Sequence, residues 1–279
     1  MTAAELIAQA AKRLSDAGVP EPELDAKILF LEAFHMDQVH FLMNRMRPLT
    51  EEQRAQQETY EVMIDRRSAR VPLQQILGSQ EFMGLTFRVT PDVLIPRQDT
   101  ETLVEQVLHE QKDPDIRLLD LCTGSGCIAI SLAVKGGYES VTATDLSEEA
   151  LKVAERNAKT HQKKIIFRQG DLFSALPRTE AGTFDIITSN PPYIPTAVIA
   201  TLEPEVREHE PMMALDGTGD GLKFYRRIAK EAGAWLKPGG AVYLEIGYDQ
   251  GKAVSELLSE AGFAKIRVVK DLPGKDRVV

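Results

Sequence analysis

A glycine-rich turn near the middle of the chain follows an apolar segment and reads Asp120-Leu121-Cys122-Thr123-Gly124-Ser125-Gly126. Glycines in such a turn let the backbone bend tightly and let a ligand approach it, while the N-terminus of the next helix offers free N–H groups. Asp145 ends the next apolar segment, where a carboxylate can accept both hydroxyl hydrogens of an adenosine ribose. Glycines alone would also fit a turn without a ligand. Together with Asp145 they predict a nucleoside-cofactor site.

The acidic residue that opens this turn bears on the choice of cofactor. The spacing Gly124-x-Gly126-x-x-Ala129 also fits the relaxed dinucleotide fingerprint. The carboxylate of Asp120 would repel the negative charge of a pyrophosphate, whereas it suits a cofactor with a cationic amino-acid end. S-adenosylmethionine is such a cofactor. The turn therefore favours a methyltransferase, although the dinucleotide alternative stays open at this point.

A second motif, Asn190-Pro191-Pro192-Tyr193, directly follows the apolar segment 184–188. Its prolines have no backbone donor and stiffen the turn. Two acceptors remain, the side-chain oxygen of Asn190 and the carbonyl of Pro191. They suit an NH2 group on a planar carbon, because hydrogen bonds to both N–H groups can hold it out of plane, with its lone pair directed at a sulfonium methyl. The ring of Tyr193 can stack on the flat acceptor.

Strand and helix patterns alternate around both motifs. The predicted strands are 116–121, 140–144, 164–168, 184–188 and 241–245, the predicted helices are 100–111, 128–134, 148–160 and 222–236, and the tail (264–270 and 277–279) predicts a closing hairpin. This alternation predicts an α/β fold with a mostly parallel, doubly wound, Rossmann-like sheet. Both motifs then lie at the edge of the sheet where open α/β folds bind ligands.

The first seventy residues have a different, helical pattern. Capping boxes at Thr2 with Glu5 and at Thr50 with Gln53 open two of the predicted helices. Arginines 66, 67 and 70 lie near the end of the second of these helices and are interpreted as a solvated helix end. A hairpin around Gly84 follows. We expect a helical domain over 1–71, a hairpin linker over 72–98 and a methyltransferase domain over 99–279.

Composition narrows the function classes. The net charge is −9, from 33 basic and 42 acidic residues. A protein that binds a long stretch of naked DNA is usually basic, because neutralisation of the DNA phosphates supplies most of the affinity, so the charge disfavours such a protein. The two cysteines, Cys122 and Cys127, are too few for a disulfide framework or a zinc site and are expected to be packing residues. No signal-peptide core and no membrane-length apolar run is found. We therefore expect a cytoplasmic protein without a membrane or metal partner.

With these motifs in place, the chain resembles a known family. Asp120–Gly126 with Asn190–Tyr193 is similar to the class I methyltransferases that modify exocyclic or amide NH2 groups. Further segments resemble the HemK/PrmC family over nearly the whole chain: Pro72–Gly78, Glu81-Phe82, Leu94–Arg97, Asp99–Glu101, Glu210-Pro211, Ala214–Gly217 and Gly221-Leu222. That family uses S-adenosylmethionine, which leaves as S-adenosylhomocysteine, to methylate N5 of the glutamine in the Gly-Gly-Gln motif of peptide-chain release factors.

The resemblance implies a role for each matched residue. Its cofactor-binding residues map onto Asp120, Cys122, Thr123, Gly124, Ser125, Gly126, Asp145, Asp171, Leu172 and Asn190, and its catalytic and substrate-binding clamp maps onto Asn190, Pro191, Pro192 and Tyr193. Three positions depart from the pattern. Cys122 stands where relatives often have glycine, Gln98 replaces a proline, and Leu172 stands where some relatives place an aromatic near the adenine, which bears on stacking.

The resemblance also implies a release factor as the protein substrate and a role in translation termination. Because residues 1–71 contain no acid–base or nucleophilic constellation and have a size that suits a protein-binding cap, we expect them to dock that substrate. We also expect a monomer. Two alternatives remain. An N6-adenine type methyltransferase of nucleic acids shares the chemistry of the Asn190 motif, but it normally needs a basic target-recognition region. A catalytically silent S-adenosylmethionine-binding, translation-associated protein is disfavoured by the intact Asp145 and Asn190.

Overall fold

The computed structural model describes residues 1–279, and contacts within it divide the chain into two compact units. The larger unit comprises residues 79–202 and 210–279. The smaller unit comprises residues 1–78 together with a later segment, 203–209. The chain therefore passes between the units three times. The sequence-based boundaries at 71 and 98 stay a prediction.

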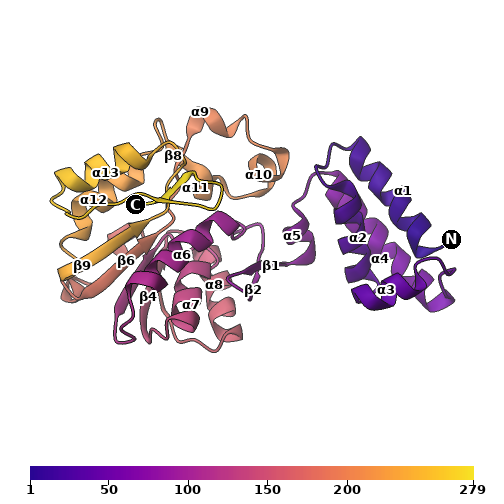
Figure 1. The fold of residues 1–279 in the computed structure, drawn as a ribbon, viewed down its shortest axis with the longest axis horizontal. Helices are drawn as coiled ribbons and strands as arrows, with labels where there is room; N and C mark the ends of the chain where they lie inside the picture. The colour runs from indigo at the N-terminus through magenta and orange to yellow at the C-terminus, as the bar shows by residue number, and fades with distance from the viewer. The chain divides into compact units, whose positions relative to one another are not determined.

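A five-stranded sheet forms the centre of the larger unit (Figure 1). Its strands are β3 (Arg117–Leu121), β4 (Ser140–Asp145), β5 (Ile166–Gln169), β6 (Phe184–Ser189) and β9 (Leu236–Leu244). They lie in the order β5-β4-β3-β6-β9, and every neighbouring pair is parallel. The predicted doubly wound parallel sheet is thus confirmed. The order reverses between β3 and β6, and a crevice for a ligand is expected at the carboxyl ends of these two strands.

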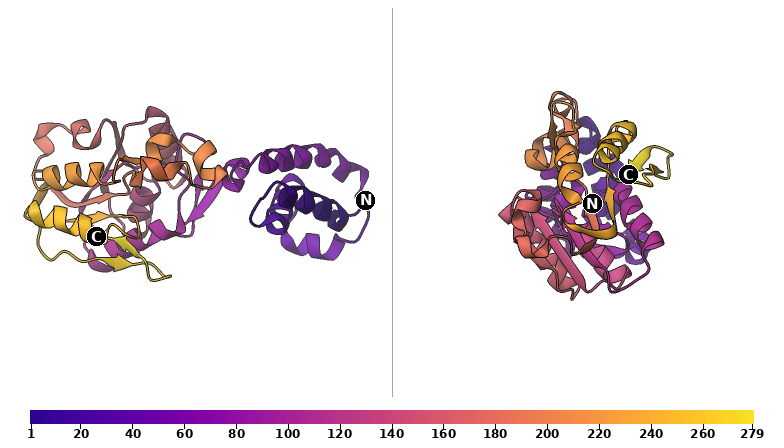
Figure 2. Two further views of the ribbon diagram at one scale, coloured as in Figure 1. Left: turned by 90° about the horizontal axis from the view of Figure 1, so that it is seen from above. Right: turned by 90° about the vertical axis from the view of Figure 1, so that its left-hand side faces the viewer.

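Helices cover both faces of this sheet (Figures 1 and 2). One face carries α6 (Gln98–Glu110), α7 (Cys127–Lys135) and α8 (Glu148–Thr160), and the other carries α12 (Lys223–Ala232) and α13 (Gly251–Glu260). Successive strand residues point to opposite faces, so Leu118 joins the first core and Leu119 the second. Ser147 caps α8 by accepting the N–H of Ala150, which begins that helix at the predicted residue.

Shorter elements complete the larger unit. They are β1 (Ser79–Phe82), β2 (Leu85–Arg88), η1 (Leu172–Ala175), η2 (Arg178–Glu180), β7 (Ile194–Pro195), α9 (Thr196–Ile199), α11 (Met212–Leu215), β8 (Asp216–Thr218), β10 (Val269–Lys270) and β11 (Asp276–Val278). β1 and β2 form the predicted hairpin, and Met83 and Gly84 between them both have positive φ, as a two-residue hairpin turn requires. β10 and β11 form the predicted closing hairpin.

Large boundary differences from the predictions lie between α12 and β9. The helix expected over 222–236 ends at Ala232, and the strand expected over 241–245 begins five residues earlier, at Leu236. The pairing explains the difference: Phe184 opposes Leu236 but Ile186 opposes Ala241, so β9 takes up Lys237–Gly240 as a bulge beside β6. Helix α13 was not predicted.

The smaller unit consists of helices. They are α1 (Ala3–Asp16), α2 (Pro22–Ala33), α3 (Gln38–Asn44), α4 (Glu51–Ser68), α5 (Leu73–Leu77) and, from the later segment, α10 (Pro204–His209). Both predicted capping boxes are present, at Thr2 and at Thr50. An aromatic core holds the helices together, and in it the fully buried Tyr60 donates its hydroxyl to the carbonyl of Ala26. In the whole chain, no helix combines the length and apolar character needed to span a membrane.

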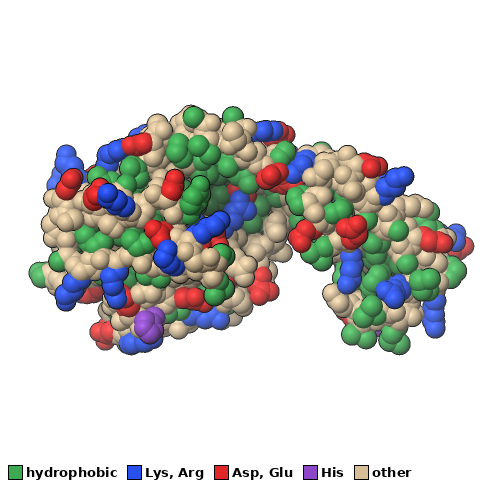
Figure 3. Space-filling view, turned by 45° about the horizontal axis from the view of Figure 1, so that its top comes forward, with side chains coloured by type: hydrophobic (Ala, Val, Ile, Leu, Met, Phe, Trp, Pro, Cys, Tyr) green, Lys and Arg blue, Asp and Glu red, His purple; other side chains and the backbone are tan.

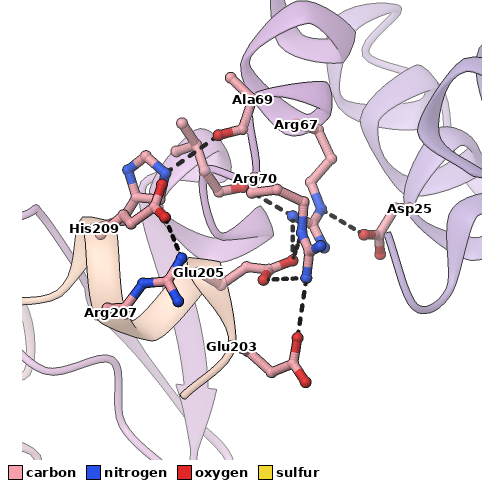
Figure 4. A network of polar contacts seen from close by, with 10 residues as sticks. Asp25, Arg67, Ala69, Arg70, Glu203, Glu205, Arg207 and His209 are labelled. Carbon is pink, nitrogen blue, oxygen red and sulfur yellow. Dashed lines mark hydrogen bonds and ion pairs between the residues drawn. The ribbon is translucent and has the colours of Figure 1, made fainter. Parts of the chain in front are cut away.

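Buried ion pairs attach α10 to the smaller unit (Figure 4). Arg67, only 6% exposed at its side chain, donates to Asp25 (2.7 Å) and to Glu205 of α10 (2.9 Å). Arg70 donates to Glu205 through two nitrogens, at 2.7 and 2.5 Å. The interpretation of these arginines as a solvated helix end is therefore wrong for Arg67 and Arg70. No local pattern reveals the pairing, because Glu205 lies more than 130 positions later in the chain.

The two arginines stabilise the ionised form of Glu205. Burial on its own would raise its pKa, yet hydrogen bonds from Arg70 and Arg67 hold the pKa below its ordinary value. The backbone of the same segment is also held, since Gln75 donates its side-chain amide to the carbonyl of His209 (2.9 Å). A piece of chain flanked on both sides by the larger unit is thus an integral part of the helical unit.

Replacement of Arg67 by methionine tests this network. The variant leaves Asp25 buried without its partner, and removal of one member of a buried ion pair costs about 3–5 kcal/mol. Amide hydrogen exchange in α1, α2 and α4 should report a loss of that size in the opening free energy. Arg66→Met is the matched control, because Arg66 is exposed on the same helix turn, and it should change by no more than about 0.5 kcal/mol. Equal effects of the two variants would contradict the network.

Candidate functional site

A cavity of about 300 Å³ lies in the larger unit, and the predicted motifs supply much of its wall. Cys122–Ser125 from the glycine turn, Asp145 after β4, and Asn190 and Pro192 after β6 all line it. These residues follow strands β3, β4 and β6, so the cavity occupies the expected crevice at the switch point of the sheet. Its volume is at the lower end of the range of ligand pockets, roughly 300–1,000 Å³.

The glycine turn has the geometry that its sequence predicts. Gly124 has a φ of +55° and donates its N–H to Oδ2 of Asp145 at 2.8 Å. Gly126, the N-cap of α7, has a φ of +81°, and a Cβ there would lie 2.9 Å from Cδ1 of Ile130. Backbone conformation and helix packing therefore require these glycines before any ligand binds.

Cys122 adopts the left-handed conformation, with a φ of +57°, which is uncommon for a residue other than glycine. Burial raises the pKa of its thiol, and the nearby carboxylate of Asp145 raises it further. Burial also raises the pKa of Cys127, to about 12. Both thiols are therefore protonated at neutral pH, in keeping with packing roles rather than nucleophilic ones.

Asp145 is fixed from two sides. Its Oδ2 accepts the N–H of Gly124, and its Oδ1 accepts the N–H of Ser147 at 2.9 Å. Burial raises the pKa of this carboxyl group, while these backbone hydrogen bonds oppose the rise. A carboxylate has about four lone-pair sites, so acceptor capacity remains for a ligand in the cavity that Asp145 lines.

Asp120 lies behind the cavity wall and is not one of its lining residues. Its fully buried carboxyl group accepts the hydroxyl of Thr123 (2.6 Å) and the hydroxyl of Thr188 on β6 (2.8 Å). Burial raises its pKa to about 7, and hydrogen bonds from the two threonines oppose that rise. The sequence suggested that this carboxylate faces the cationic end of a cofactor. In this structure its contacts position the glycine turn.

The predicted residues near the adenine contribute an apolar wall. Leu172 is buried, has a φ of +53° and lines the cavity together with Asp171. The carboxylate of Asp171 is paired with Arg227 on α12, at 2.8 and 2.9 Å. Leu172 therefore offers packing rather than ring stacking at this position.

The Asn190 motif is held by partners from three other parts of the chain: α6, the residue after β9 and the residue before α13. Asn190 donates Nδ2 to Oγ1 of Thr100 on α6, at 3.3 Å. The hydroxyl of Tyr193 contacts Oε1 of Glu245 at 3.4 Å, and the Tyr193 carbonyl accepts a hydrogen bond from Gln250 at 3.0 Å. Pro191 and Tyr193, unlike Asn190 and Pro192, do not line the cavity.

Four residues near the site had no role assigned from sequence. Arg97 lines the cavity and binds both carboxylate oxygens of the buried Glu210, each at 2.8 Å. Burial raises the pKa of Glu210, and Arg97 opposes that rise. Thr100 and Glu245 support the Asn190 motif. Glu245 could have been suspected, since it ends a predicted strand. Arg97 and Glu210 lie in segments that resemble the family, but their pairing across 113 positions gives no local signal.

Comparisons with known proteins identify the family and the fold of this chain. Residues 5–78 match the family model described as the PrmC N-terminal domain, and residues 98–202 match the methyltransferase small domain. A release factor glutamine methyltransferase of Cereibacter sphaeroides is 43% identical and covers 100% of this chain and 98% of its own. One from Geobacter sulfurreducens is 42% identical and covers 95% and 91%. The crystal structure of a methyltransferase from Pyrococcus furiosus (20% identity, 80% and 95% coverage, TM-score 0.52) shares the fold.

Replacement of Asp145 by alanine tests the cofactor end of the cavity. The variant removes a charged acceptor, and a hydrogen bond to a charged group contributes roughly 1.5–3 kcal/mol. Calorimetric titration with S-adenosylmethionine should show at least about a tenfold weaker affinity. Asp185→Ala, at the opposite end of β6, is the control and should bind normally. Unchanged affinity in a folded Asp145→Ala protein would remove Asp145 from the cofactor site.

Proposed function

We propose that this chain, which belongs to the family of release factor glutamine methyltransferases, transfers a methyl group from S-adenosylmethionine to N5 of the glutamine in the Gly-Gly-Gln motif of peptide-chain release factors. The observation that carries the proposal is the position of Asn190. Its rigid Asn-Pro-Pro turn stands at the wall of a cavity that the glycine turn and Asp145 also line. Asn190 of the proposed acceptor clamp and the residues of the proposed donor site therefore line one cavity.

The residues of the cavity fit S-adenosylmethionine. Asp145 keeps acceptor capacity for the ribose hydroxyls, and the turn at Gly124 leaves room for close approach to the backbone. Leu146 and Leu172 supply apolar wall. When bound, this cofactor supplies an electrophilic methyl group on a sulfonium. The orientation of the acceptor amide and the stabilisation of its developing charge are assigned to the protein's own groups.

The task of Asn190 is orientation. An amide nitrogen is a poor nucleophile because its lone pair is delocalised, and two acceptors on its N–H groups can hold it out of plane. Asn190 and the carbonyl of Pro191 supply these acceptors, and their dipoles stabilise positive charge that develops on the nitrogen. Asparagine cannot act as a base at neutral pH. An N-alkylated amide cation is acidic enough to lose its proton to water, so no dedicated base is required.

The helical unit is proposed to dock the release factor. It contains no acid–base or nucleophilic constellation, and hydrophobic side chains gather at its surface (Figure 3). Val39, Leu42, Met43 and Met46, on and just after α3, are 55–74% exposed. Exposed apolar side chains that lie together are typical of a protein-binding surface. A monomer that acts in the cytoplasm, where release factors work, fits this function.

A labelling competition tests the function against its alternatives. The protein is incubated with methyl-labelled S-adenosylmethionine, purified release factor and DNA, and the label is located by mass spectrometry. We expect it on the glutamine side chain of the release factor. Label on DNA would favour the nucleic-acid amine methyltransferase, and no label with intact cofactor binding would favour the silent binding protein.

Replacement of Asn190 by alanine tests the acceptor clamp. Removal of one preorganised electrostatic partner typically lowers turnover by about a hundredfold or more. Single-turnover methylation of the release factor should fall by that factor. The calorimetric affinity for S-adenosylmethionine should change little, because Asn190 acts on the acceptor. A variant as active as the wild type would exclude Asn190 from the mechanism.

Replacement of Met43 and Met46 by serine tests docking. Loss of central apolar contacts costs more than about 1 kcal/mol at an interface, so KM for intact release factor should rise about fivefold or more. A short peptide with the Gly-Gly-Gln motif should be methylated at the normal rate. Val62→Ser, at an exposed position of α4, serves as the control. If KM for the intact factor is unchanged, the α3 surface does not dock it.

A further inference from the structure

A buried carboxylate stands next to the Asn190 motif and has no role in the mechanism above. Glu245 follows the last residue of β9 and is 1% exposed. Its Oε1 lies 3.4 Å from the hydroxyl of Tyr193, while its Oε2 has no hydrogen-bond partner. Burial of a carboxylate costs free energy unless both oxygens accept hydrogen bonds. Glu245 is buried beside the Asn190 motif with one oxygen unpaired, so we expect a functional reason for it.

Thr100 connects this carboxylate to Asn190. Its Oγ1 accepts Nδ2 of Asn190 at 3.3 Å, and its hydroxyl lies close enough to the Glu245 carboxyl group to lower the pKa of that group. An ionised carboxylate can only accept, so ionised Glu245 attracts the single hydroxyl hydrogen of Thr100. The lone pairs of Oγ1 then face Asn190 and select its NH2 group. The other end of the Asn190 amide, Oδ1, is left free, and Asn190 and Thr100 both line the cavity.

We propose that Glu245 is a positioning residue for methyl transfer: acting through the hydroxyl of Thr100, it fixes the orientation of the Asn190 amide so that Oδ1 is presented to the acceptor NH2 group. Glu245 is not among the residues that line the cavity, so it acts at one remove from the reacting atoms. The inference rests on the proposed function, because it assigns the device that keeps the acceptor clamp in its active orientation.

The protonation of Glu245 makes this device sensitive to pH. Burial raises its pKa to about 7, with the hydrogen bond from Thr100 and the charge of Arg277 opposing the rise. Other titratable groups that interact with the carboxyl group are Asp99, Tyr193, Tyr225 and Cys127. Once protonated, Glu245 can donate to Thr100. The hydroxyl hydrogen of Thr100 then turns toward Asn190 and attracts its Oδ1. The Asn190 amide rotates, and its oxygen no longer faces the substrate in the cavity. The transfer rate should therefore fall as the pH drops through about 7.

The test compares full-length wild type with Thr100→Val, Thr100→Ser and Glu245→Gln, and uses Thr142→Val as a control. Thr142 is a buried threonine within β4, so its replacement loses a similar hydroxyl far from the clamp. Single-turnover methylation of release factor at saturating S-adenosylmethionine is measured from pH 5.5 to 9. Thermal unfolding of wild type and Glu245→Gln at pH 5 and pH 8 gives a second, activity-independent readout.

The wild type should show a one-proton loss of rate below about pH 7. Thr100→Val should be about tenfold slower at pH 8 and should lose that pH dependence, since it lacks the connecting hydroxyl. Thr100→Ser should restore both rate and profile, and Thr142→Val should match the wild type. The pKa of Glu245 is higher in the folded state than in the unfolded state, so its ionisation destabilises the fold. The melting temperature of Glu245→Gln minus that of the wild type should therefore be larger at pH 8 than at pH 5.

Two results would overturn the proposal. Thr100→Val with wild-type rate and profile would show that the hydroxyl does not transmit orientation. An acidic limb that survives in both Thr100→Val and Glu245→Gln would belong to another group, such as Asp120. Failure of the underlying function is distinguishable, because wild type itself would then leave the release factor unlabelled at every pH.

Discussion

The arrangement of the site depends on the two hydrogen bonds that the buried carboxyl group of Asp120 accepts. It accepts one hydroxyl from Thr123 in the glycine turn and one from Thr188, the residue opposite it on β6. The strand that leads into the cofactor turn is thereby fixed, side chain to side chain, to the strand that leads into Asn190. In the proposed reaction, donor and acceptor must be positioned to within a fraction of an ångström of the reactive geometry. We expect the Asp120 contacts to hold the two turns in that arrangement.

Other ion pairs hold neighbouring loops in place. Arg97 and Glu210 join the segment before α6 to the segment before α11, and both segments contribute residues to the cavity wall. In the helical unit, Arg67 and Arg70 hold Glu205 in the same manner. Each pair connects parts of the chain more than a hundred positions apart. The loops after the strands would otherwise be the least constrained parts of an α/β fold.

Local sequence patterns predict the residues that form the turns of this site. The ion pairs that hold these turns and the neighbouring segments in place arise from tertiary contacts. Gly124, Gly126, Asp145 and Asn190 could be predicted because turn conformation, strand ends and donor chemistry are local properties. Glu205 could not, because its partners Arg67 and Arg70 come from the other end of the chain and have the pattern of an ordinary exposed helix end. For the same reason the bulge that draws Lys237–Gly240 into β9 was missed, since only pairing with β6 explains it.

The central claim is that the Asn190 amide presents its oxygen to the acceptor nitrogen while Thr100 holds its NH2 group. The most direct measurement is a crystal structure of the protein with S-adenosylhomocysteine and a Gly-Gly-Gln peptide from a release factor. The account predicts the peptide's amide nitrogen about 2.7–3.2 Å from both Oδ1 of Asn190 and the carbonyl of Pro191, with Nδ2 still on Thr100. A glutamine amide held by other groups, or an Asn190 amide turned the opposite way, would contradict it.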